Sequence, residues 1–482
     1  MNKATKHWSI CKSCLGRGTK RRKVRKKIRI QYKTDCLNYD QSNKTKPAPV
    51  KPRGAKYPCL NCNGTGLITT NTAPVADLKK YPHIAIIGGG IGGVALAIAC
   101  LHRHIPFTLY ERDASFDARS QGYGLTLQQA SKAMASLGIL KLEDGIVSTR
   151  HVVLATNGDI IGEWGMRKWM QNHKDTNKKR TNIHIARQAL RLELIKQLGG
   201  EQNISWNHQL INFKEEASHV NLSFNVNGKT QHTKADLVIG ADGIRSTTRR
   251  LLIGETTTPL QYLGCIVILG ICPLNALNDI DSSLLDGATV FQTANGNERI
   301  YMMPYNKDAV MWQLSFPMPQ QDAKILSNKG AKFLKEEACR RVPWHSPIPE
   351  ILKATQEHLI SGYPVYDRTI LTTDLLKKAK RVSLLGDAAH PMSPFKGQGA
   401  NQALLDALAL ARNVLKGCAN TEDWKKPEGI KHLILNNYEQ EMITRSGKKV
   451  KDSADAAQFL HSKTVLHKSN EPRGRVLKRK DT

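Results

Sequence analysis

The sequence lacks the apolar N-terminal segment that a secretory signal carries, because its first residues, MNKATKHWSICKSC, are polar and basic. We therefore expect a soluble, cytoplasmic protein whose ten cysteines are thiols or metal ligands and not disulfides. One run, 84–101, is apolar enough to resemble a membrane span, but its glycines argue against that interpretation. No other run is long enough, so we expect no membrane span.

Acidic residues are scarce, since 41 Asp and Glu face 72 Lys and Arg and leave a net charge of +31. The excess lies at the two ends. Residues 1–82 hold 20 basic and 3 acidic residues, and residues 463–482 hold 7 and 2. The charge therefore belongs mainly to terminal appendages and not to the central body.

The most basic stretch, TKRRKVRKKIRIQYK at 19–33, lies between two cysteine pairs. Its charge would allow contact with the phosphate backbone of a nucleic acid. The alternative is a solvated basic hairpin. Few aromatic residues interleave this stretch, so the sequence does not predict base stacking.

Apolar runs divide the chain into parts with different predicted secondary structure. Strands such as HIAIIG and RVSLLGD alternate with helical patterns and predict an α/β domain, whereas CIVILGIC and AVMWQLSFP predict an inserted, largely antiparallel sheet. Helices are expected over 126–138, 186–198 and 430–465. The predicted parts are an N-terminal module at 1–70, a linker at 71–81, the α/β domain at 82–149, 183–250 and 365–420, the inserted sheet at 150–182 and 251–364, C-terminal helices at 421–465 and a flexible basic tail at 466–482.

The N-terminal module contains one motif twice, CKSCLGRG at 11–18 and CLNCNGTG at 59–66. Each C-x-x-C turn places two thiolates on one side of a tight bend, so Cys11, Cys14, Cys59 and Cys62 would supply the four sulfurs of a structural Zn²⁺ site. A redox dithiol or unligated cysteines are the alternatives. The repeat resembles half of the cysteine-rich domain of DnaJ-type chaperones, where paired repeats share one zinc. The linker at 71–81 predicts that this module and the α/β domain that follows it are separate.

A dinucleotide-binding signature follows the linker. Gly88, Gly90 and Gly93 in IAIIGGGIGG come directly after a buried strand and open a helix, which is the context that such a fingerprint needs. The next strand ends at Glu111, with Arg112 beside it, where an acid accepts hydrogen bonds from ribose hydroxyls and disfavours an extra ribose phosphate. These residues fit NAD and FAD equally well.

Two further strands end in an acid, at Asp242 in DLVIGADG and at Asp387 in LLGDAAHP. Asp242 alone is also compatible with a simple Asp-Gly turn. Together with the Gly-rich fingerprint, the ordered set resembles the three motifs of class A flavoprotein monooxygenases, the p-hydroxybenzoate hydroxylase family, over residues 82–415.

The resemblance implies a fold and a set of cofactor contacts. The α/β domain would be a Rossmann-like FAD-binding domain, and the inserted sheet would be the substrate domain. Asp387 would bind the ribityl hydroxyls, and the turn through Gly397, Gly399, Ala400 and Asn401 would lie beside the isoalloxazine ring. Arg119 and Arg187 match family arginines near the flavin. The helix start near Gly399 would stabilise the reduced, anionic ring by about 0.3–2 kcal/mol.

The resemblance also implies a reaction, in which NAD(P)H reduces FAD and O₂ then forms a flavin C4a-hydroperoxide that hydroxylates an aromatic or polycyclic molecule. No catalytic side chain is assigned, because the chemistry belongs to the flavin. The sequence has no second Gly-rich fingerprint for NAD(P)H, so NADH and NADPH both stay open. The segment MSPFKGQGAN is also similar to that of tetracycline-hydroxylating enzymes.

Two other functions remain as alternatives. The first is a flavin dehydrogenase that does not transfer oxygen; a halogenase is disfavoured because Trp164 and Trp169 do not form a W-x-W-x-x-P signature. The second is a zinc-binding protein that binds nucleic acid or acts like a chaperone, with an inactive flavin domain. The sequence leaves the oligomeric state open.

Overall fold

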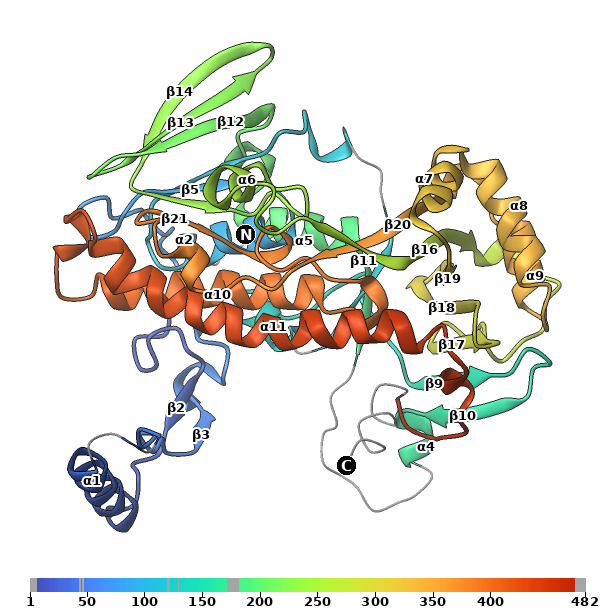
Figure 1. The fold of residues 1–482 in the computed structure, drawn as a ribbon, viewed down its shortest axis with the longest axis horizontal. Coiled ribbons are helices and arrows are strands. Elements are labelled where there is room, and N and C mark those ends of the chain that lie inside the picture. The colour runs from blue at the N-terminus through green and yellow to red at the C-terminus, as the bar shows by residue number, and fades with distance from the viewer. Residues whose placement is uncertain are drawn as a thin grey trace.

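The computed structural model describes residues 7–42, 45, 47–118, 122–128, 130–170 and 182–472. Two large bodies lie side by side, with a small N-terminal module projecting below one of them (Figure 1). One body is built on a parallel sheet and the other on a large, mainly antiparallel sheet. The predicted α/β fold with an inserted antiparallel sheet is confirmed.

The parallel sheet has the strand order β21-β15-β5-β6. Its strands are β5 (Ile84–Ile87), β6 (Phe107–Tyr110), β15 (Leu237–Gly240) and β21 (Val382–Leu384). Parallel strands end at the same edge of a sheet, which is the usual ligand side of such folds. Glu111, Asp242 and Asp387 follow β6, β15 and β21 within three residues and therefore come to this one edge.

Each face of the parallel sheet is covered by a different layer. Helices pack on one face, because Ile84, Ile86 and Ile239 join their hydrophobic core. These helices are α2 (Ile91–Leu101), α3 (Ser131–Ala135), α5 (Arg187–Leu198), α10 (Gly399–Gly417) and α11 (Asn436–Phe459), which a π-helix at Lys431–Leu435 precedes. Ala85 and Val238 face the other way, toward the antiparallel sheet of β12 (His208–Glu215), β13 (Val220–Val226) and β14 (Lys229–Ala235). Helix α6 (Thr247–Ile253) follows β15.

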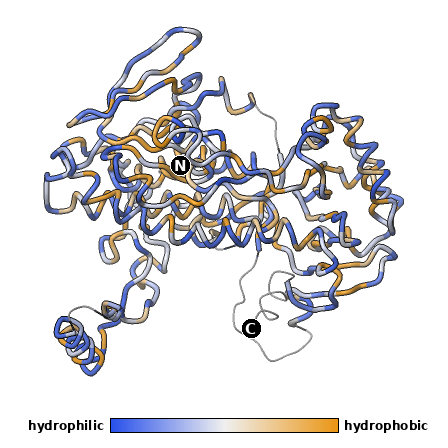
Figure 2. Tube along the Cα trace, in the orientation of Figure 1, coloured by the Kyte–Doolittle hydropathy of each residue, from blue (hydrophilic) through white to orange (hydrophobic). Residues whose placement is uncertain are grey.

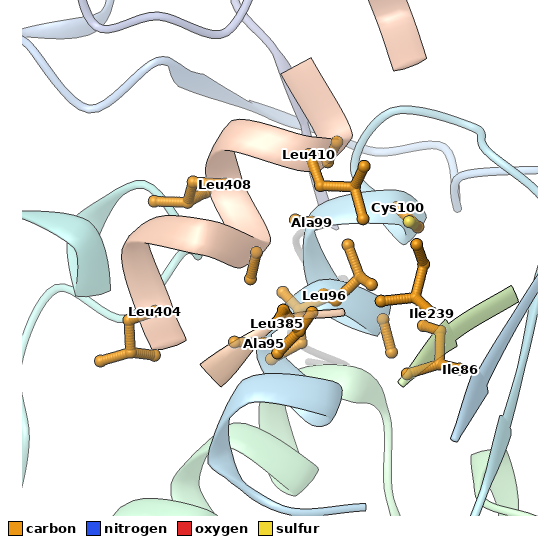
Figure 3. Packing of buried hydrophobic residues seen from close by; sticks show 14 of the residues in the cluster. Ile86, Ala95, Leu96, Ala99, Cys100, Ile239, Leu385, Leu404, Leu408 and Leu410 are labelled. Carbon is orange, nitrogen blue, oxygen red and sulfur yellow. The ribbon is translucent and has the colours of Figure 1, made fainter. Parts of the chain in front are cut away.

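Small side chains let α2 and α10 approach closely. A Cβ at Gly92 would come within 2.6 Å of the Leu385 side chain and 3.2 Å of the Cβ of Ala403. Figure 3 shows α2 and α10 next to each other, with Ala99 of α2 near Leu410 of α10 and Ala95 beside Leu385. Burial of each such leucine contributes about 1.5–3 kcal/mol. Hydrophobic residues accordingly run through the centre of the molecule, and hydrophilic ones through outer segments such as β14 (Figure 2).

The larger sheet has the order β10-β9-β17-β18-β19-β16-β20, and only β9 and β17 run parallel. Its strands are β9 (Arg150–Leu154), β10 (Ile160–Trp164), β16 (Leu260–Pro273), β17 (Thr289–Ala294), β18 (Arg299–Asn306), β19 (Ala309–Pro317) and β20 (Ile360–Arg368). Helices α7 (Gln320–Asn328), α8 (Ala331–Arg341) and α9 (Ile348–Ala354) pack on one face, and α4 (Met166–Met170) follows β10. Along β18, Ile300 and Met302 point to these helices, whereas Met303 joins a cluster on the opposite face.

A small sheet of β7 (Gly124–Leu127), β11 (Ile183–Ala186) and β8 (Ile146–Val147) lies against β18. The helix predicted over 126–138 is therefore wrong at its start. Leu125 and Leu127 pair with β11, and the following helix, α3, covers only Ser131–Ala135. Gly138, with φ of +84°, turns the chain just beyond it. Tertiary pairing has overridden the local helical pattern.

The N-terminal module is held by two short antiparallel pairs, β1 (His7–Ile10) with β4 (Leu67–Thr70) and β2 (Thr19–Arg21) with β3 (Lys56–Pro58). The basic stretch continues into α1 (Lys26–Gln41), which has no buried residue and projects away from the body (Figure 1). The alternative of a basic hairpin is therefore wrong for residues 26–33 of that stretch, whose Lys, Arg and Gln are good helix formers. Within the described residues, no helix has the length and hydropathy needed to cross a bilayer.

A buried carboxylate in β20 predicts a pH dependence of stability. Asp367 is 4% exposed, its Oδ1 has no partner among the described residues, and burial raises the pKa of its carboxyl to about 6. An unfolded aspartate titrates near 4, so the folded state binds the extra proton between pH 4 and 6 and loses stability as pH rises through that window. The loss is on the order of 2 kcal/mol and persists above pH 6.

We therefore expect Asp367→Asn to raise the melting temperature at pH 8 and to leave it unchanged at pH 4, as measured by differential scanning fluorimetry. The exposed Asp308 provides the control, because Asp308→Asn should change neither value. An equal effect of Asp367→Asn at both pH values would contradict the assignment.

Candidate functional site

One cavity of about 2170 Å³ runs between the two bodies, from the edge of the parallel sheet to the large sheet. Pockets for a single small ligand usually hold about 300–1,000 Å³, so this cavity has room for a dinucleotide and a second molecule. Six of the predicted cofactor-binding residues line it: Gly90, Arg187, Asp387, Gly397, Gly399 and Ala400.

The Gly-rich turn has the geometry that its sequence predicts. Gly88 has φ of +113°, and a Cβ there would come within 2.6 Å of the Ala241 carbonyl oxygen. A Cβ at Gly93 would lie 1.9 Å from the Gly88 oxygen, so only glycine lets α2 start this close to β5. By contrast, nothing lies within 4 Å of a Cβ at Gly90, where the turn faces the cavity. This turn therefore leaves space for a pyrophosphate at the start of α2.

Glu111 lies beside the same turn. Its Oε2 accepts a hydrogen bond from Gly89 N at 2.6 Å, and its Oε1 accepts one from Asp113 N at 3.1 Å. Arg112 is exposed and does not line the cavity. Arg191 of α5, which the sequence did not single out, donates from Nε to Gly89 O at 2.8 Å. The turn is therefore held from two sides.

The carboxylate of Asp242 is engaged locally. It accepts hydrogen bonds from Ser246 Oγ and from Thr248 N and Oγ1, and so caps the start of α6. Burial raises the pKa of Asp242 despite these bonds. Its neighbours Gly243 and Arg245 line the cavity, but Asp242 itself does not. The turn interpretation that the sequence left open therefore describes this side chain.

Asp387 has the opposite orientation, because its side chain is open to the cavity. The surrounding protein raises the pKa of its carboxyl by desolvation, while the charges of His390 and Arg187 oppose that rise. Arg187 is the first residue of α5, and its guanidinium lies 5.8 Å from the centre of the Tyr123 ring. Arg119 lies outside the described residues.

Asn401 holds the turn that precedes α10 through hydrogen bonds of its side chain. Its Nδ2 donates to Gly397 O at 2.7 Å and to Thr126 O at 2.8 Å, and its Oδ1 accepts from Gln128 N at 2.9 Å. Gly397 adopts the left-handed conformation, with φ of +57°. The side chain of Asn401 thus organises the loop from within, while Ala400 next to it lines the cavity.

A buried charge network lies behind this loop, and the sequence analysis missed it. Asp406 of α10 is fully buried and accepts from Gly386 N at 2.9 Å, from His390 Nε2 at 2.6 Å and from Arg445 Nη2 of α11 at 2.6 Å. Burial alone would raise its pKa, but His390 and Arg445 keep the pKa below its usual range. His390 is therefore held inside the loop by this contact. Asp406 therefore positions the turn that carries Asp387.

The far wall of the cavity belongs to the large sheet. Arg299 is 5% exposed, donates from Nε to Gln292 Oε1 at 2.8 Å and lies over the Tyr301 ring at 4.9 Å. Burial lowers the pKa of Arg299 to about 10, so it is still a cation at neutral pH. Among the described residues it forms no ion pair with a carboxylate, and Gln313 Nε2 beside the cavity is buried without a partner. This wall offers hydrogen-bond donors to an anionic ligand.

A chain of hydrogen bonds runs along another part of the wall. Thr126 Oγ1 contacts His184 Nδ1 at 3.1 Å, His184 Nε2 contacts Ser148 Oγ at 2.8 Å, and Ser148 Oγ contacts His151 Nε2 at 3.2 Å. His151 stacks on Trp164 with 5.5 Å between ring centres. Burial lowers the pKa of His184 to about 3 and of His151 to about 4, so both rings are neutral. The network fixes the shape of this wall.

Comparison with known proteins agrees with this geometry. The family described as FAD binding domain matches residues 81–426. The chain belongs to this family of flavoprotein monooxygenases. It is 28% identical to a chloroplastic zeaxanthin epoxidase of Solanum lycopersicum over 84% of this chain, and 26% identical to an aurachin C monooxygenase/isomerase of Stigmatella aurantiaca over 70% of this chain and 81% of the relative. The fold is similar to that of Klebsiella pneumoniae HpxO complexed with FAD and uric acid, with a TM-score of 0.64, 20% identity and coverage of 83% and 92%.

The relatives extend beyond the matched region. The chain spans 58% and 55% of the length of two of the zeaxanthin epoxidases that it matches. The family match begins at residue 81, so the cysteine module lies outside it.

In front of the FAD-binding domain, the four predicted metal ligands come together. The Sγ atoms of Cys11, Cys14, Cys59 and Cys62 all lie within 4.8 Å of one another and are buried. Two pairs are separated by 4.0 and 3.8 Å, which is too long for a disulfide at about 2.05 Å. A tetrahedral Zn²⁺ with bonds of about 2.3 Å places its sulfurs about 3.8 Å apart.

The backbone around these sulfurs also fits a metal–thiolate site. Gly18 N and Gly66 N donate to the sulfurs of Cys14 and Cys62 at 3.3 and 3.2 Å, in equivalent positions of the two repeats. A Cβ at Gly18 would lie 2.2 Å from the Gly64 oxygen, so the two turns pack backbone against backbone. Amide donors to ligand sulfurs stabilise the thiolate form.

The position of Asp387 generates a prediction for the FAD-binding domain. Asp387→Ala should weaken FAD binding by about 10-fold to 1,000-fold, because a charged acceptor contributes about 1.5–3 kcal/mol for each hydrogen bond that it makes. Titration of the flavin-free protein with FAD, followed by flavin fluorescence, gives the dissociation constant. Asp308→Ala, at an exposed position, is the control and should bind FAD normally. Recovery of Asp387→Ala fully loaded with FAD would show that this carboxylate is not a ligand of the cofactor.

Proposed function

We propose that this protein is an NAD(P)H-dependent FAD monooxygenase that hydroxylates an anionic aromatic or polycyclic molecule. The single observation that carries the proposal is the continuous cavity between the Gly-rich turn with Asp387 and the wall with Arg299. One end offers dinucleotide contacts, and the other offers an uncompensated cation within a largely apolar surface. Bound FAD would supply the redox chemistry and the activation of O₂.

The residues of the parallel-sheet edge would hold the cofactor. The start of α2 would face the pyrophosphate, Glu111 would lie beside the adenosine ribose, and Asp387 would accept hydrogen bonds from the ribityl chain. The start of α10 at Gly399 faces the cavity, so its dipole would stabilise negative charge on the ring. Arg187 and the turn fixed by Asn401 would complete this contact surface.

The substrate would occupy the end next to the large sheet. Met303, Met311 and Ile271 contribute apolar surface there, and Tyr301 and Tyr363 contribute aromatic rings. Such a surface excludes water and suits a planar ring system. Arg299 would bind a carboxylate, phenolate or enolate of the substrate, because a buried guanidinium without an anionic partner is costly.

The names of similar proteins support a small organic substrate. HpxO has been crystallised with uric acid, and aurachin C and zeaxanthin name the other two relatives. These are ring-bearing molecules, and none of them is proposed as the substrate of this chain. We also propose that the four cysteines of the N-terminal module bind Zn²⁺ in a structural role, because four thiolates without an open position form a closed site.

The proposed reaction predicts oxygen consumption. The purified protein should be yellow, with an absorbance maximum at about 450 nm, and should consume O₂ when NADH or NADPH is added with an acidic phenol or polycycle. An oxygen electrode measures the uptake, and mass spectrometry with ¹⁸O₂ shows whether one labelled atom enters the product. Flavin reduction without ¹⁸O incorporation over a broad substrate panel would favour the dehydrogenase alternative.

Arg299 predicts the charge preference of the substrate end. Arg299→Gln should raise the KM for an acidic substrate found in that panel by about 10-fold to 100-fold, since a charge-assisted hydrogen bond contributes about 1.5–3 kcal/mol. The KM for the methyl ester or methyl ether of that substrate should change little. Arg340→Gln, on the exposed surface of α8, is the control. Equal effects of Arg299→Gln on charged and neutral substrates would refute the role of Arg299.

A further inference from the structure

The cysteine module and the FAD-binding domain meet at Arg103, in the loop that follows α2. Arg103 is 1% exposed. Its Nη1 donates to Ala99 O in the FAD-binding domain at 2.8 Å. Its Nη2 lies 3.5 Å from the carbonyl oxygen of Gly16, which belongs to the first cysteine turn of the module. A Cβ at Gly16 would come within 3.0 Å of this guanidinium. The first cysteine turn therefore lies directly against Arg103.

The charge of Arg103 is not balanced by a carboxylate among the described residues. Its Nε is buried without a partner, and the nearby cation of Arg412 disfavours its charge further. Burial lowers the pKa of Arg103 to about 10, so the side chain is still charged at neutral pH. A guanidinium in this position needs an anion close by. Gly16, which contacts this guanidinium, lies two residues beyond Cys14 in the first cysteine turn.

A loaded metal site would supply that anion. Four thiolates and one Zn²⁺ carry a net charge of −2, and this charge would be buried in the module beside the Arg103 guanidinium. Arg103 and the metal–thiolate group would then compensate each other, and neither would be stable alone in that place. This step rests on the proposed function of the four cysteines as zinc ligands.

Two further contacts join the module to the body. Trp8 of β1 packs over Gly138, where a Cβ would come within 2.8 Å of the indole ring. The chain that leads into the FAD-binding domain is also fixed, because Asp77 N donates to His104 O at 2.8 Å and His104 Nδ1 lies 2.8 Å from Val75 O. Both the module and the segment after it therefore contact the loop beyond α2.

We propose that zinc and FAD binding are thermodynamically coupled through α2, with Arg103 as the counter-ion and positioning residue that joins the two sites. Helix α2 is a single element of 11 residues, whose first turn faces the cofactor cavity and which ends two residues before Arg103. Loss of the metal would remove the anion at one end and loosen the helix whose other end would face the pyrophosphate of FAD. Because coupling is reciprocal, FAD strengthens zinc binding by the same factor as zinc strengthens FAD binding.

The test uses the full chain purified with zinc and FAD under reducing conditions. Zinc is removed with a chelator, and the FAD dissociation constant is measured before and after by flavin fluorescence. We expect it to rise by about 5-fold to 150-fold without zinc and to return when zinc is added back. Competition with a chromophoric chelator gives the zinc affinity, which should be higher by the same factor in the FAD-loaded protein than in the FAD-free protein.

Variants separate Arg103 from a general effect of unfolding. Arg103→Gln should weaken zinc binding and reduce the coupling factor toward one, whereas Arg103→Lys, which keeps the charge, should retain part of both. Lys12→Gln is the matched control, because Lys12 is an exposed cation in the same cysteine turn. Chelation of the unmodified protein tests the coupling even where a variant does not fold.

The outcomes distinguish the coupling from the assignments on which it rests. A protein that contains FAD but no zinc would overturn the metal site and the coupling with it. A protein that contains zinc but does not bind FAD would overturn the proposed function. A protein that contains both, but whose FAD affinity does not change on chelation, would overturn the coupling alone. An unchanged coupling factor in Arg103→Gln would refute the role of Arg103.

Discussion

The buried carboxylate of Asp406 is the constraint on which the candidate site depends. It accepts hydrogen bonds from the backbone of Gly386, from His390 and from Arg445. It therefore joins the turn after β21, the loop that contains His390 and helix α11 at one point. A buried ion pair adds little net stability compared with apolar packing, but it allows few alternative arrangements. Its effect here is to fix the turn from which Asp387 enters the cavity.

The cavity has two chemically different ends because a different sheet forms each of them. The parallel sheet presents backbone amides and carboxylates at its edge, because its strands end together, and close packing of α2 on α10 keeps this edge rigid. The large sheet alternates, so Met302 packs against its helices while Met303 joins the apolar face toward the cavity. Neither surface alone would bind both a dinucleotide and a ring-bearing molecule, and their placement against each other creates the combined site.

Local sequence patterns predicted the parts of the site whose chemistry is local. Gly93 is required by a backbone contact with Gly88 inside the strand–turn–helix unit, Gly88 has a positive φ in the same turn, and Asp387 comes within three residues of its strand, so these positions are visible in short motifs. Asp406 and Arg445 could not be found in this way, because their partners lie far along the chain and become neighbours only when α10 and α11 pack together. The helix predicted at 126–138 was wrong for the same reason. Pairing of β7 with β11, whose partners Leu125 and Ile185 lie 60 residues apart in the chain, decided that segment.

Some buried arginines are satisfied by hydrogen bonds within the protein, whereas others need an anionic ligand. Arg249 is buried without a carboxylate, yet its guanidinium donates to the carbonyl oxygens of Ala388 and Ala389 and to the hydroxyl of Thr258. Arg299 lacks such a set, and Arg103 donates to the carbonyl oxygens of Ala99 and Gly16 but leaves its Nε without a partner. Arg299 has one hydrogen bond from the described residues, at the wall of the cavity, and Arg103 has a buried Nε without a partner beside the cysteines. Since an uncompensated buried charge costs several kcal/mol, each of these two arginines indicates an anion that the chain itself does not provide. The substrate would be that anion at Arg299, and the metal–thiolate group would be that anion at Arg103.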